Sequence, residues 1–378
     1  MRTVTLGEVA QVDRKTVDPA TLPAETYYLG LEHIERGGRI VGRDSVGGAE
    51  VTSSKFLFTS RHVLFGKLRP NLAKVSRPDF DGVCSTDILP VRPGPDLDRS
   101  YLAHFLTQPT MIALASRRAT GANLPRLSPS SLAEFVIPLP SIAEQRRVAA
   151  ILDHADALRA KRCQVLDQLD SLEEGIAQSF FASRDDPRRE LSELADKVVV
   201  GHVGPTSEFF RDRGVPFLRT GNIGKGQVQR SDLARVAPEF HERLRKSQLR
   251  AGDVLVSRVV TDEIRAALLP DDLDGANCAN IIIVRPSERV YETTILAFLG
   301  LPSTQRRLLG RRVGSAQSVV NTTVLKRLLI PEVPVEAQRL LARKMNQLMV
   351  QRRQRHHQVR QSNELFGSLQ SRAFRGEL

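Results

Sequence analysis

Hydrophobic residues in the segment 141–183 recur at steps that alternate between three and four, which is typical of a coiled-coil seam. The stripe consists of Val148, Ile151, Ala155, Leu158, Val165, Leu169, Leu172 and Ile176. Arg162 alone interrupts it, and a polar residue at a seam position commonly fixes the register of paired helices. Pro138 and Pro140 end the preceding segment and Ser141 can cap the next. We therefore expect one long, exposed helix of roughly 60 Å.

The same pattern, a proline followed by a long heptad stripe, recurs in the segment 334–378, which contains no proline after Pro334. Its apolar stripe consists of Leu341, Met345, Leu348, Val359, Phe366, Leu369 and Ala373. Arg352 and Arg355 occupy polar positions in the stripe. Two such helices in one chain are expected to pair with each other.

The segment 1–140 alternates short apolar runs with glycine- and proline-containing turns, which predicts a mixed α/β domain. Strands are expected at 27–31, 62–66, 82–91 and 135–137, and helical spacing covers 101–115. A polar, proline-broken linker at 182–188 precedes a second stretch of the same character.

One offset of 193 residues relates the two halves, connecting Gly82 to Gly275, Pro93 to Pro286, Gly121 to Gly314 and Ile137 to Ile330. We therefore predict an α+β protein with an internal repeat, in which two similar domains, 1–140 and 184–333, alternate with the helices 141–183 and 334–378. The two copies differ most between the matched positions. Diverged loops on one scaffold indicate two domains that recognise different targets. The alternative is a duplicated structural domain whose loops have diverged without such a role.

Charge points to a polyanionic partner: 55 Lys and Arg residues against 43 Asp and Glu residues give a net charge of +12. Arginine enrichment from a GC-rich genome would produce the same excess. The three cysteines are far apart and no Cys/His spacing suits zinc, so we expect no metal. The chain shows neither a signal-peptide-like start nor an apolar run near eighteen residues, which predicts a soluble, cytoplasmic protein.

Motifs for catalysis are missing. The chain contains no Asn/Asp-Pro-Pro-aromatic tetrad of an amino-methyltransferase and no Walker A loop. The glycine-rich run 221–226 has the wrong spacing for a phosphate loop, and the acidic run 271–274 lies between Pro270 and Gly275, so we expect turns at both. No catalytic residue is assigned, and we predict a protein that is not itself an enzyme.

Basic and amide side chains gather instead in loops of both domains, where Arg, Asn and Gln can read base edges and further cations can neutralise phosphates. The candidates in the first domain are Lys67, Arg69, Asn71, Lys74, Arg117, Arg118, Asn123 and Arg126. Those in the second domain are Arg219, Asn222, Arg258, Arg265, Arg311, Arg312, Gln317 and Asn321. For each single residue a solvated surface charge is the competing interpretation.

The run Ile137-Pro138-Leu139-Pro140-Ser141-Ile142-Ala143-Glu144-Gln145-Arg146 resembles a motif of the specificity subunits of type I restriction–modification systems. The preceding Leu127–Leu132, the following Ile151-Leu152-Asp153 and the segment Phe65–Pro70 are also similar to that family. The second copy departs from the motif, since Glu144-Gln145-Arg146 corresponds to Ala337-Gln338-Arg339.

The resemblance implies two target-recognition domains held apart by an antiparallel pair of helices, each domain reading one half of a bipartite double-stranded DNA site. The helices would set the unread spacer and dock two methyltransferase subunits, with restriction subunits joining that core. S-adenosylmethionine, ATP and Mg²⁺ would belong to the partners, and this chain would bind no cofactor. Candidate docking residues are Glu144, Gln145, Arg146, Gln338 and Arg339.

Apolar surface for a partner is expected on the first helix at Ala149, Ala150, Leu152 and Ala157, beyond the narrow seam. Two other interpretations stay open at this point. One is the recognition part of a DNA-modifying enzyme with a cryptic activity of its own. The other is a coiled-coil scaffold with two protein-binding domains, which predicts no salt-dependent DNA affinity.

Overall fold

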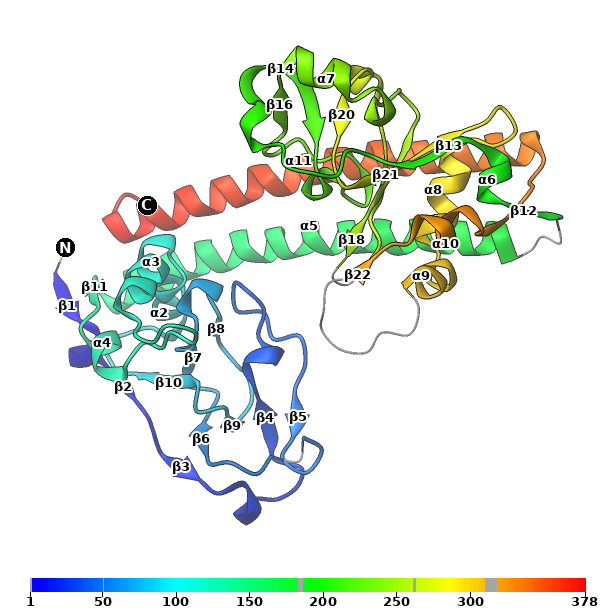
Figure 1. Ribbon diagram of the computed structural model, residues 1–378. Helices are drawn as coiled ribbons and strands as arrows, with labels where there is room; N and C mark the ends of the chain where they lie inside the picture. The colour runs from blue at the N-terminus through cyan, green and yellow to red at the C-terminus, as the bar shows by residue number, and fades with distance from the viewer. Residues whose placement is uncertain (1, 50, 183–185, 261–262, 310–317) are drawn as a thin grey trace. The chain divides into compact units, whose positions relative to one another are not determined.

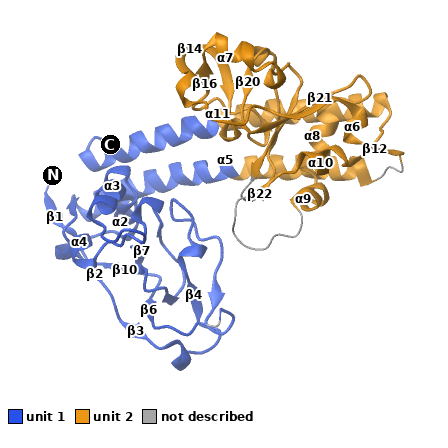
Figure 2. Ribbon diagram, in the orientation of Figure 1, with its two compact units in different colours: residues 1–163, 358–378 blue, residues 164–357 orange. Residues whose placement is uncertain are grey.

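The computed structural model describes residues 2–49, 51–182, 186–260, 263–309 and 318–378 (Figure 1). The chain forms two compact units (Figure 2). Unit 1 contains residues 1–163 and 358–378, and unit 2 contains residues 164–357. Each unit therefore combines one globular part with one end of the two long helices, α5 (Ile142–Ala182) and α11 (Val335–Arg375). No helix in the described ranges is both long and apolar enough to span a membrane.

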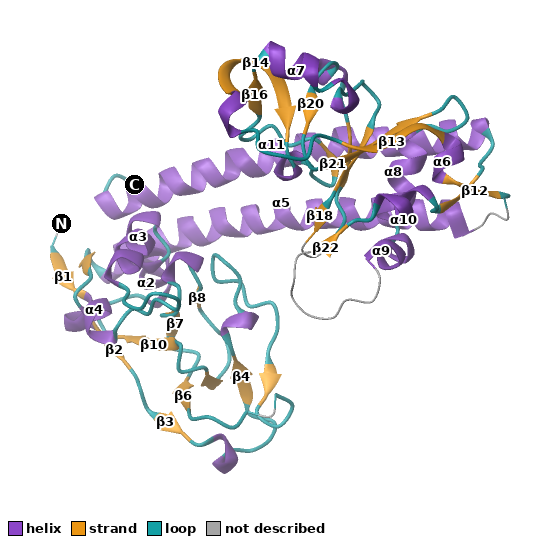
Figure 3. Cartoon of the chain, viewed as in Figure 1, coloured by secondary structure: helices purple, strands orange, loops and turns teal. Residues whose placement is uncertain are grey.

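The globular part of unit 1 mixes small sheets with short helices (Figure 3). Its four-stranded sheet has the order β2 (Ala10–Val12), β10 (Ile88–Pro93), β7 (Val63–Gly66) and β8 (Val75–Ser76). A five-stranded sheet has the order β3 (Thr16–Val17), β6 (Lys55–Phe58), β9 (Gly82–Cys84), β4 (Tyr27–Leu29) and β5 (Asp44–Ser45). The strands β1 (Thr3–Thr5) and β11 (Val136–Pro138) pair antiparallel. The helices are α1 (Leu6–Val9), α2 (Arg99–Leu106), α3 (Pro109–Arg118) and α4 (Pro129–Ala133).

Unit 2 is built in the same way. Its five-stranded sheet has the order β13 (Ala195–Val200), β21 (Ile281–Pro286), β17 (Val254–Ser257), β19 (Ala266–Leu268) and β15 (Gly226–Gln227). The smaller sheets are β16 (Ala234–Val236), β14 (Phe210–Leu218) and β20 (Asn277–Cys278), then β12 (Arg188–Glu190) with β23 (Leu329–Pro331), and β18 (Val259–Val260) with β22 (Ser318–Val319). The helices are α6 (Leu191–Leu194), α7 (Pro238–Arg243), α8 (Glu292–Gly300), α9 (Pro302–Leu309) and α10 (Thr322–Lys326).

The predicted α+β fold with its internal repeat is confirmed. The offset found in the sequence relates both ends of β10 to β21, of α4 to α10, of β11 to β23 and of α5 to α11. Each long helix has 41 residues. Two expected elements differ. The helical stretch 101–115 is two helices, because Pro109 cannot donate the backbone hydrogen bond that a continuous helix needs. The strand expected at 82–91 is two strands, β9 and β10, with a turn at 85–87 between them.

The long helices pair antiparallel, since the start of α5 lies with the end of α11 in unit 1. Arg162 donates from Nη1 to the carbonyl of Gln358 at 3.2 Å and also contacts Ser362 Oγ, as expected for a polar seam residue. Arg159 donates to Asn363 Oδ1 at 2.9 Å. Its counterpart in the repeat, Arg352, makes a similar contact in unit 2, where its Nη2 lies 3.0 Å from Asp170 Oδ1. The internal symmetry therefore extends to single side-chain pairs.

Helix ends complete the core of each globular part. In unit 1, Ala149 and Leu152 of α5 are 3% and 0% exposed and pack with Phe374 of α11 in the domain core. The expectation that Ala149 and Leu152 offer a surface to a partner is therefore wrong, because their own domain covers them. Ala150 and Ala157 are exposed.

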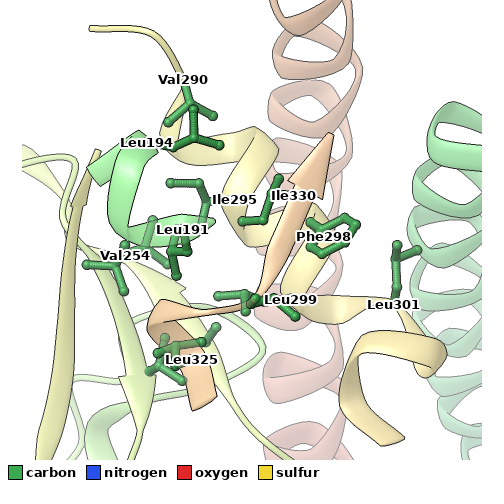
Figure 4. Packing of buried hydrophobic residues seen from close by; sticks show 14 of the residues in the cluster. Leu191, Leu194, Val254, Val290, Ile295, Phe298, Leu299, Leu301, Leu325 and Ile330 are labelled. Atoms are coloured by element: carbon green, nitrogen blue, oxygen red, sulfur yellow. The ribbon is translucent and has the colours of Figure 1, made fainter. Parts of the chain in front are cut away.

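Unit 2 has the corresponding core. Figure 4 shows Leu191 and Leu194 of α6, Ile295 and Phe298 of α8 and Ile330 of β23 gathered in one interior. Leu341 and Met345 of α11, together with Ala177 and Phe181 of α5, belong to the same cluster. Burial of these side chains fastens the domain to the helix pair through non-directional contacts.

Candidate nucleic-acid interface

Two basic loops of the first domain lie side by side. The backbone N–H of Arg69 donates to the carbonyl of Pro125 at 2.8 Å, and that of Leu127 donates to the carbonyl of Lys67 at 3.0 Å. These bonds join the connection 67–74, which follows β7, to the loop 120–126, which precedes α4. We call residues 67–74, 85–87 and 117–126 the first basic surface.

Arg69 has a left-handed backbone with φ of 49° and stands immediately before the short 3-10 helix Pro70–Leu72. Such a conformation is costly for a residue with a Cβ, so surrounding bonds must hold it. The side chain is exposed, and its Nη2 donates to the carbonyl of Asn123 at 3.4 Å. Arg69 and Asn123, which come from different loops, therefore meet on the surface.

Arg126 is held by a residue that the sequence did not single out. Its Nε and Nη2 donate to the two carboxylate oxygens of Asp87 at 2.8 and 3.3 Å. This hydrogen bonding and the charge of Asp87 raise the pKa of Arg126. Asp87 lies in the tight turn between β9 and β10, so it places a carboxylate in the middle of the first basic surface.

The other first-domain candidates have different surroundings. Lys74 donates to the carbonyl of Leu31 at 2.6 Å, which uses its ammonium within the domain. Arg118 pairs with Glu134 at 3.2 Å. Asn71 and Arg117 are exposed, and Lys67 is half-buried. Exposed side chains are the ones that a DNA backbone or base edge can reach.

The second domain repeats the arrangement around Arg258. The backbone N–H of Val320 donates to the carbonyl of Arg258 at 2.8 Å, as Leu127 does to Lys67 in the first domain. Arg258 Nη1 lies 3.4 Å from Oδ1 of Asn280, which is the counterpart of Asp87 in the repeat. An arginine therefore faces an acceptor at the same turn in both domains, a carboxylate in one and an amide in the other.

Arg219 and Asn222 differ sharply in access. Arg219 is exposed, donates to the carbonyl of Asp232 at 2.7 Å and lines a cavity of about 420 Å³ together with Asn280. Asn222 is 2% exposed, and its amide bonds the backbone of Arg219, Gln229 and Ser231. Asn222 shapes the turn, and a base edge has no access to it.

Two more second-domain candidates differ in their surroundings. Asn321 accepts from the backbone N–H of Thr323 at 2.8 Å and caps α10, as Ser128 caps α4 in the first domain. Arg265 is exposed and its Nε lies 3.6 Å from Glu263. Arg311, Arg312 and Gln317 lie outside the described residues.

The glycine-rich and acidic runs form turns, as expected. Thr220–Asn222 is a short 3-10 helix, and so is Asp271–Leu273, where Asp272 pairs with Arg230 at 2.5 Å. Within the described parts of the chain, no group of three or more His, Cys, Asp and Glu side chains is placed to hold a metal ion.

The five docking candidates divide into surface and interior. Arg146 is exposed and lies 4.0 Å from Asp98, and Glu144 pairs with Arg147 at 2.7 Å. Arg339 donates to the hydroxyl of Tyr291 at 3.1 Å. Gln145 and Gln338 are 0% and 2% exposed, so their side chains face their own domains and no partner can contact them there.

Comparison with known proteins gives matches to one family. The model of the type I restriction modification DNA specificity domain matches residues 1–169. The EcoDI specificity subunit of Escherichia coli is 29% identical over 179 residues, 46% of this chain and 40% of that protein. Residues 1–169 of this chain are therefore similar to the DNA specificity domain of type I restriction–modification specificity subunits.

Other members of the specificity-subunit family extend the match. The EcoBI specificity subunit of Escherichia coli is 21% identical over 316 residues, covering 74% of this chain and 66% of that protein. The chain thus matches less than two thirds of the length of either E. coli protein. The resemblance predicted from the sequence is confirmed, and these matches do not support the modifying-enzyme and scaffold alternatives.

Two solved structures share the fold over the full length of the chain. One, from work on complex assembly and conformational transition of the type I R-M system, has a TM-score of 0.56 at 22% identity and covers 100% of this chain and 98% of its own. The other, the S subunit of a type I system from M. genitalium, has a TM-score of 0.58 at 13% identity and covers 99% and 96%.

Proposed function

We propose that this chain is the DNA-recognition subunit of a type I restriction–modification complex, with each globular part reading one half of a bipartite site. The observation that carries the proposal is the repeated loop geometry: in both domains the residue after the central strand accepts a backbone hydrogen bond from the segment before the next helix, and an arginine lies beside the turn that holds Asp87 or Asn280. That arginine is Arg126, from the loop before α4, in the first domain and Arg258, after β17, in the second. Repetition of a basic surface on a duplicated scaffold suits two half-sites. The net charge of +12 suits a polyanionic partner.

Within the first basic surface, the exposed Arg69, Asn71, Arg117, Asn123 and Arg126 are proposed to contact DNA. Arg126 and Asn123 have side chains that can bond guanine and adenine edges bidentately, and the remaining cations neutralise phosphates. Asp87 keeps the guanidinium of Arg126 oriented when DNA is absent. Preorganised donors of this kind lower the entropy cost of binding.

Within the second domain, Arg219, Arg258 and Arg265 are the proposed contacts. Arg258 lies 3.4 Å from Asn280, and Arg219 lines a cavity together with Asn280, whose amide offers both a donor and an acceptor. Because an amide and a carboxylate present different hydrogen-bonding groups to a base, the two domains would select different half-sites.

Partner subunits would dock on the long helices. Leu158, Leu172, Leu340, Val350 and Leu365 are between 46% and 61% exposed along α5 and α11. Such apolar side chains, beside Glu144, Arg146 and Arg339, suit two methyltransferase subunits, with restriction subunits added outside them. In this proposal the chain itself is non-catalytic and cytoplasmic, and S-adenosylmethionine, ATP and Mg²⁺ are used by the partners.

Co-expression with its methyltransferase subunit, followed by sizing of the purified complex and methylome sequencing of host DNA, tests the proposal. The expected result is a complex of two methyltransferase chains with one of these chains that marks a split motif. A chain that elutes alone and adds no split motif to the methylome would favour the scaffold interpretation.

A further inference from the structure

Gln145, in the first turn of α5, is a fully buried amide with every strong hydrogen-bonding group engaged. Its Nε2 donates to the carbonyls of Asp96 and Pro140, both at 2.9 Å. Its Oε1 accepts from the backbone N–H of Asp98 at 2.8 Å. Asp98 is the N-cap of α2, so one side chain of the long helix holds both the start of α2 and the segment that leads into α5.

Gln338 makes the same bonds in the other half. Its Nε2 donates to the carbonyls of Arg289 and Val333 at 3.1 and 2.7 Å, and its Oε1 accepts from the backbone N–H of Tyr291 at 2.7 Å. Each of these four residues is related by the offset of the repeat to its counterpart around Gln145. Tyr291 is the N-cap of α8, the counterpart of α2.

A buried amide would be costly at this position if its only role were to hold the domain against the long helix. An apolar side chain would join the neighbouring cores without leaving donors and acceptors to satisfy. Hydrogen bonds differ from apolar contacts because they are directional, and three of them from one planar amide fix the angle between the elements that they join. The same local design appears in two domains whose surface loops have diverged.

We propose that Gln145 and Gln338 are positioning residues that set the angle of each recognition domain on the helix pair, and thereby the spacer length that the complex accepts. The proposal rests on the function proposed above, because spacer selection has meaning only for a reader of two half-sites. It also replaces partner docking as the role of these two glutamines. The strands β10 and β21 run directly into the clamped segments, so a change of angle there is transmitted to the loops beyond.

The test uses the purified complex and a set of duplexes that keep both half-sites while the spacer changes by one base pair at a time. Gln145→Met and Gln338→Met keep the length of the side chain but remove its donors and acceptor. Each variant is expected to lower the preference for the native spacer over its neighbours by about tenfold, since directional bonds are lost. The penalty for a wrong base inside either half-site should not change.

Gln178→Met is the matched control, because Gln178 is an exposed glutamine on the same helix. It should keep the spacer preference of the wild type. Equal loss of binding at all spacers, or failure of both Met variants to fold in thermal melts, would assign a purely structural role and overturn the inference. If the wild-type complex itself binds no split site, the proposed function fails first, and the two failures are thereby distinguished.

Discussion

Arg352 joins the two long helices in unit 2 through polar contacts. Its side chain is 11% exposed, and it lies 3.0 Å from Asp170 and 3.2 Å from Glu173 on α5. It also donates to the carbonyl of Lys225 in the globular part at 3.2 Å. Burial raises the pKa of Glu173, and the charge of Arg352 opposes that shift.

Replacing Arg352 by Ala would leave two carboxylates without their cation in a largely buried seam. Breaking a buried pair from one side costs roughly 3–5 kcal/mol, and the 36% exposure of Asp170 reduces our expectation to about 2–4 kcal/mol. For a unit of this size, that loss of unfolding free energy lowers the Tm by roughly 4–16 °C. Thermal and urea unfolding followed by circular dichroism of the full chain measure it.

Substitutions of two further arginines serve as controls for this measurement. Arg159, the counterpart of Arg352, contacts Asn363 and the ring of Phe366 at 4.4 Å, and its ion pair with Asp156 at 2.8 Å is solvent-accessible. Arg159→Ala should therefore cost only about 1 kcal/mol. Arg353 is exposed, and Arg353→Ala should change stability by less than about 0.5 kcal/mol.

A compensating variant completes the series. Combining Arg352→Ala with Asp170→Asn and Glu173→Gln should regain part of the loss, because no uncompensated carboxylate then remains. The reasoning is refuted if Arg159→Ala or Arg353→Ala destabilises the chain as much as Arg352→Ala does.

Three other outcomes are expected. Arg126→Ala should weaken binding of the first half-site by about ten- to hundredfold in a fluorescence anisotropy titration, with the second half-site unaffected; unchanged affinity would remove Arg126 from the interface. Burial raises the pKa of Asp153, but hydrogen bonds from His104 and Arg77 outweigh this effect and hold the pKa well below its usual value of 3.8. The ionised carboxylate therefore stabilises the fold fully above pH 3.8, and this stabilisation is lost as the pH falls further. The Tm difference between wild type and Asp153→Asn should therefore be full at pH 7 and shrink below pH 3.8, and a constant difference would contradict the assignment. Ellman's reagent should label one thiol per folded chain, that of the exposed Cys163. The other two thiols should not react, because burial raises the pKa of Cys278 to about 12 and also raises the pKa of Cys84. Fast labelling of a second thiol would show that a domain has opened.

Local signals in the sequence were sufficient for the repeat and for the long helices. Proline ends a strand and a heptad stripe marks a helix regardless of what lies around them, so α5 and α11 begin within one residue of the expected positions. The constant offset between the two halves is a property of the chain alone. Pro109 is a local signal of the same kind, so the break between the helices α2 and α3 could also have been predicted from the sequence.

Side-chain burial could not be predicted in this way, because it depends on segments distant in the chain. Gln145 is polar and lies on an expected solvent-facing helix, yet the segment holding Asp96 and Asp98 folds over it. Leu152 is covered by its own domain for the same reason. Asp87 became relevant only when the fold brought it to Arg126. Asn222, by contrast, bonds a backbone N–H three residues away, a pattern typical of turn-forming asparagine.

The contribution of α11 to the core of unit 1 has a consequence for synthesis on the ribosome. Phe374, whose ring lies 4.8 Å from that of Tyr101, is separated from Leu152 of the same core by more than half of the chain. At about 5–20 residues per second, on the order of 10–40 seconds pass between their emergence. During that interval the first domain has an incomplete interior and exposes apolar surface. Chaperone binding to the nascent chain should therefore persist until residues near 374 have left the exit tunnel.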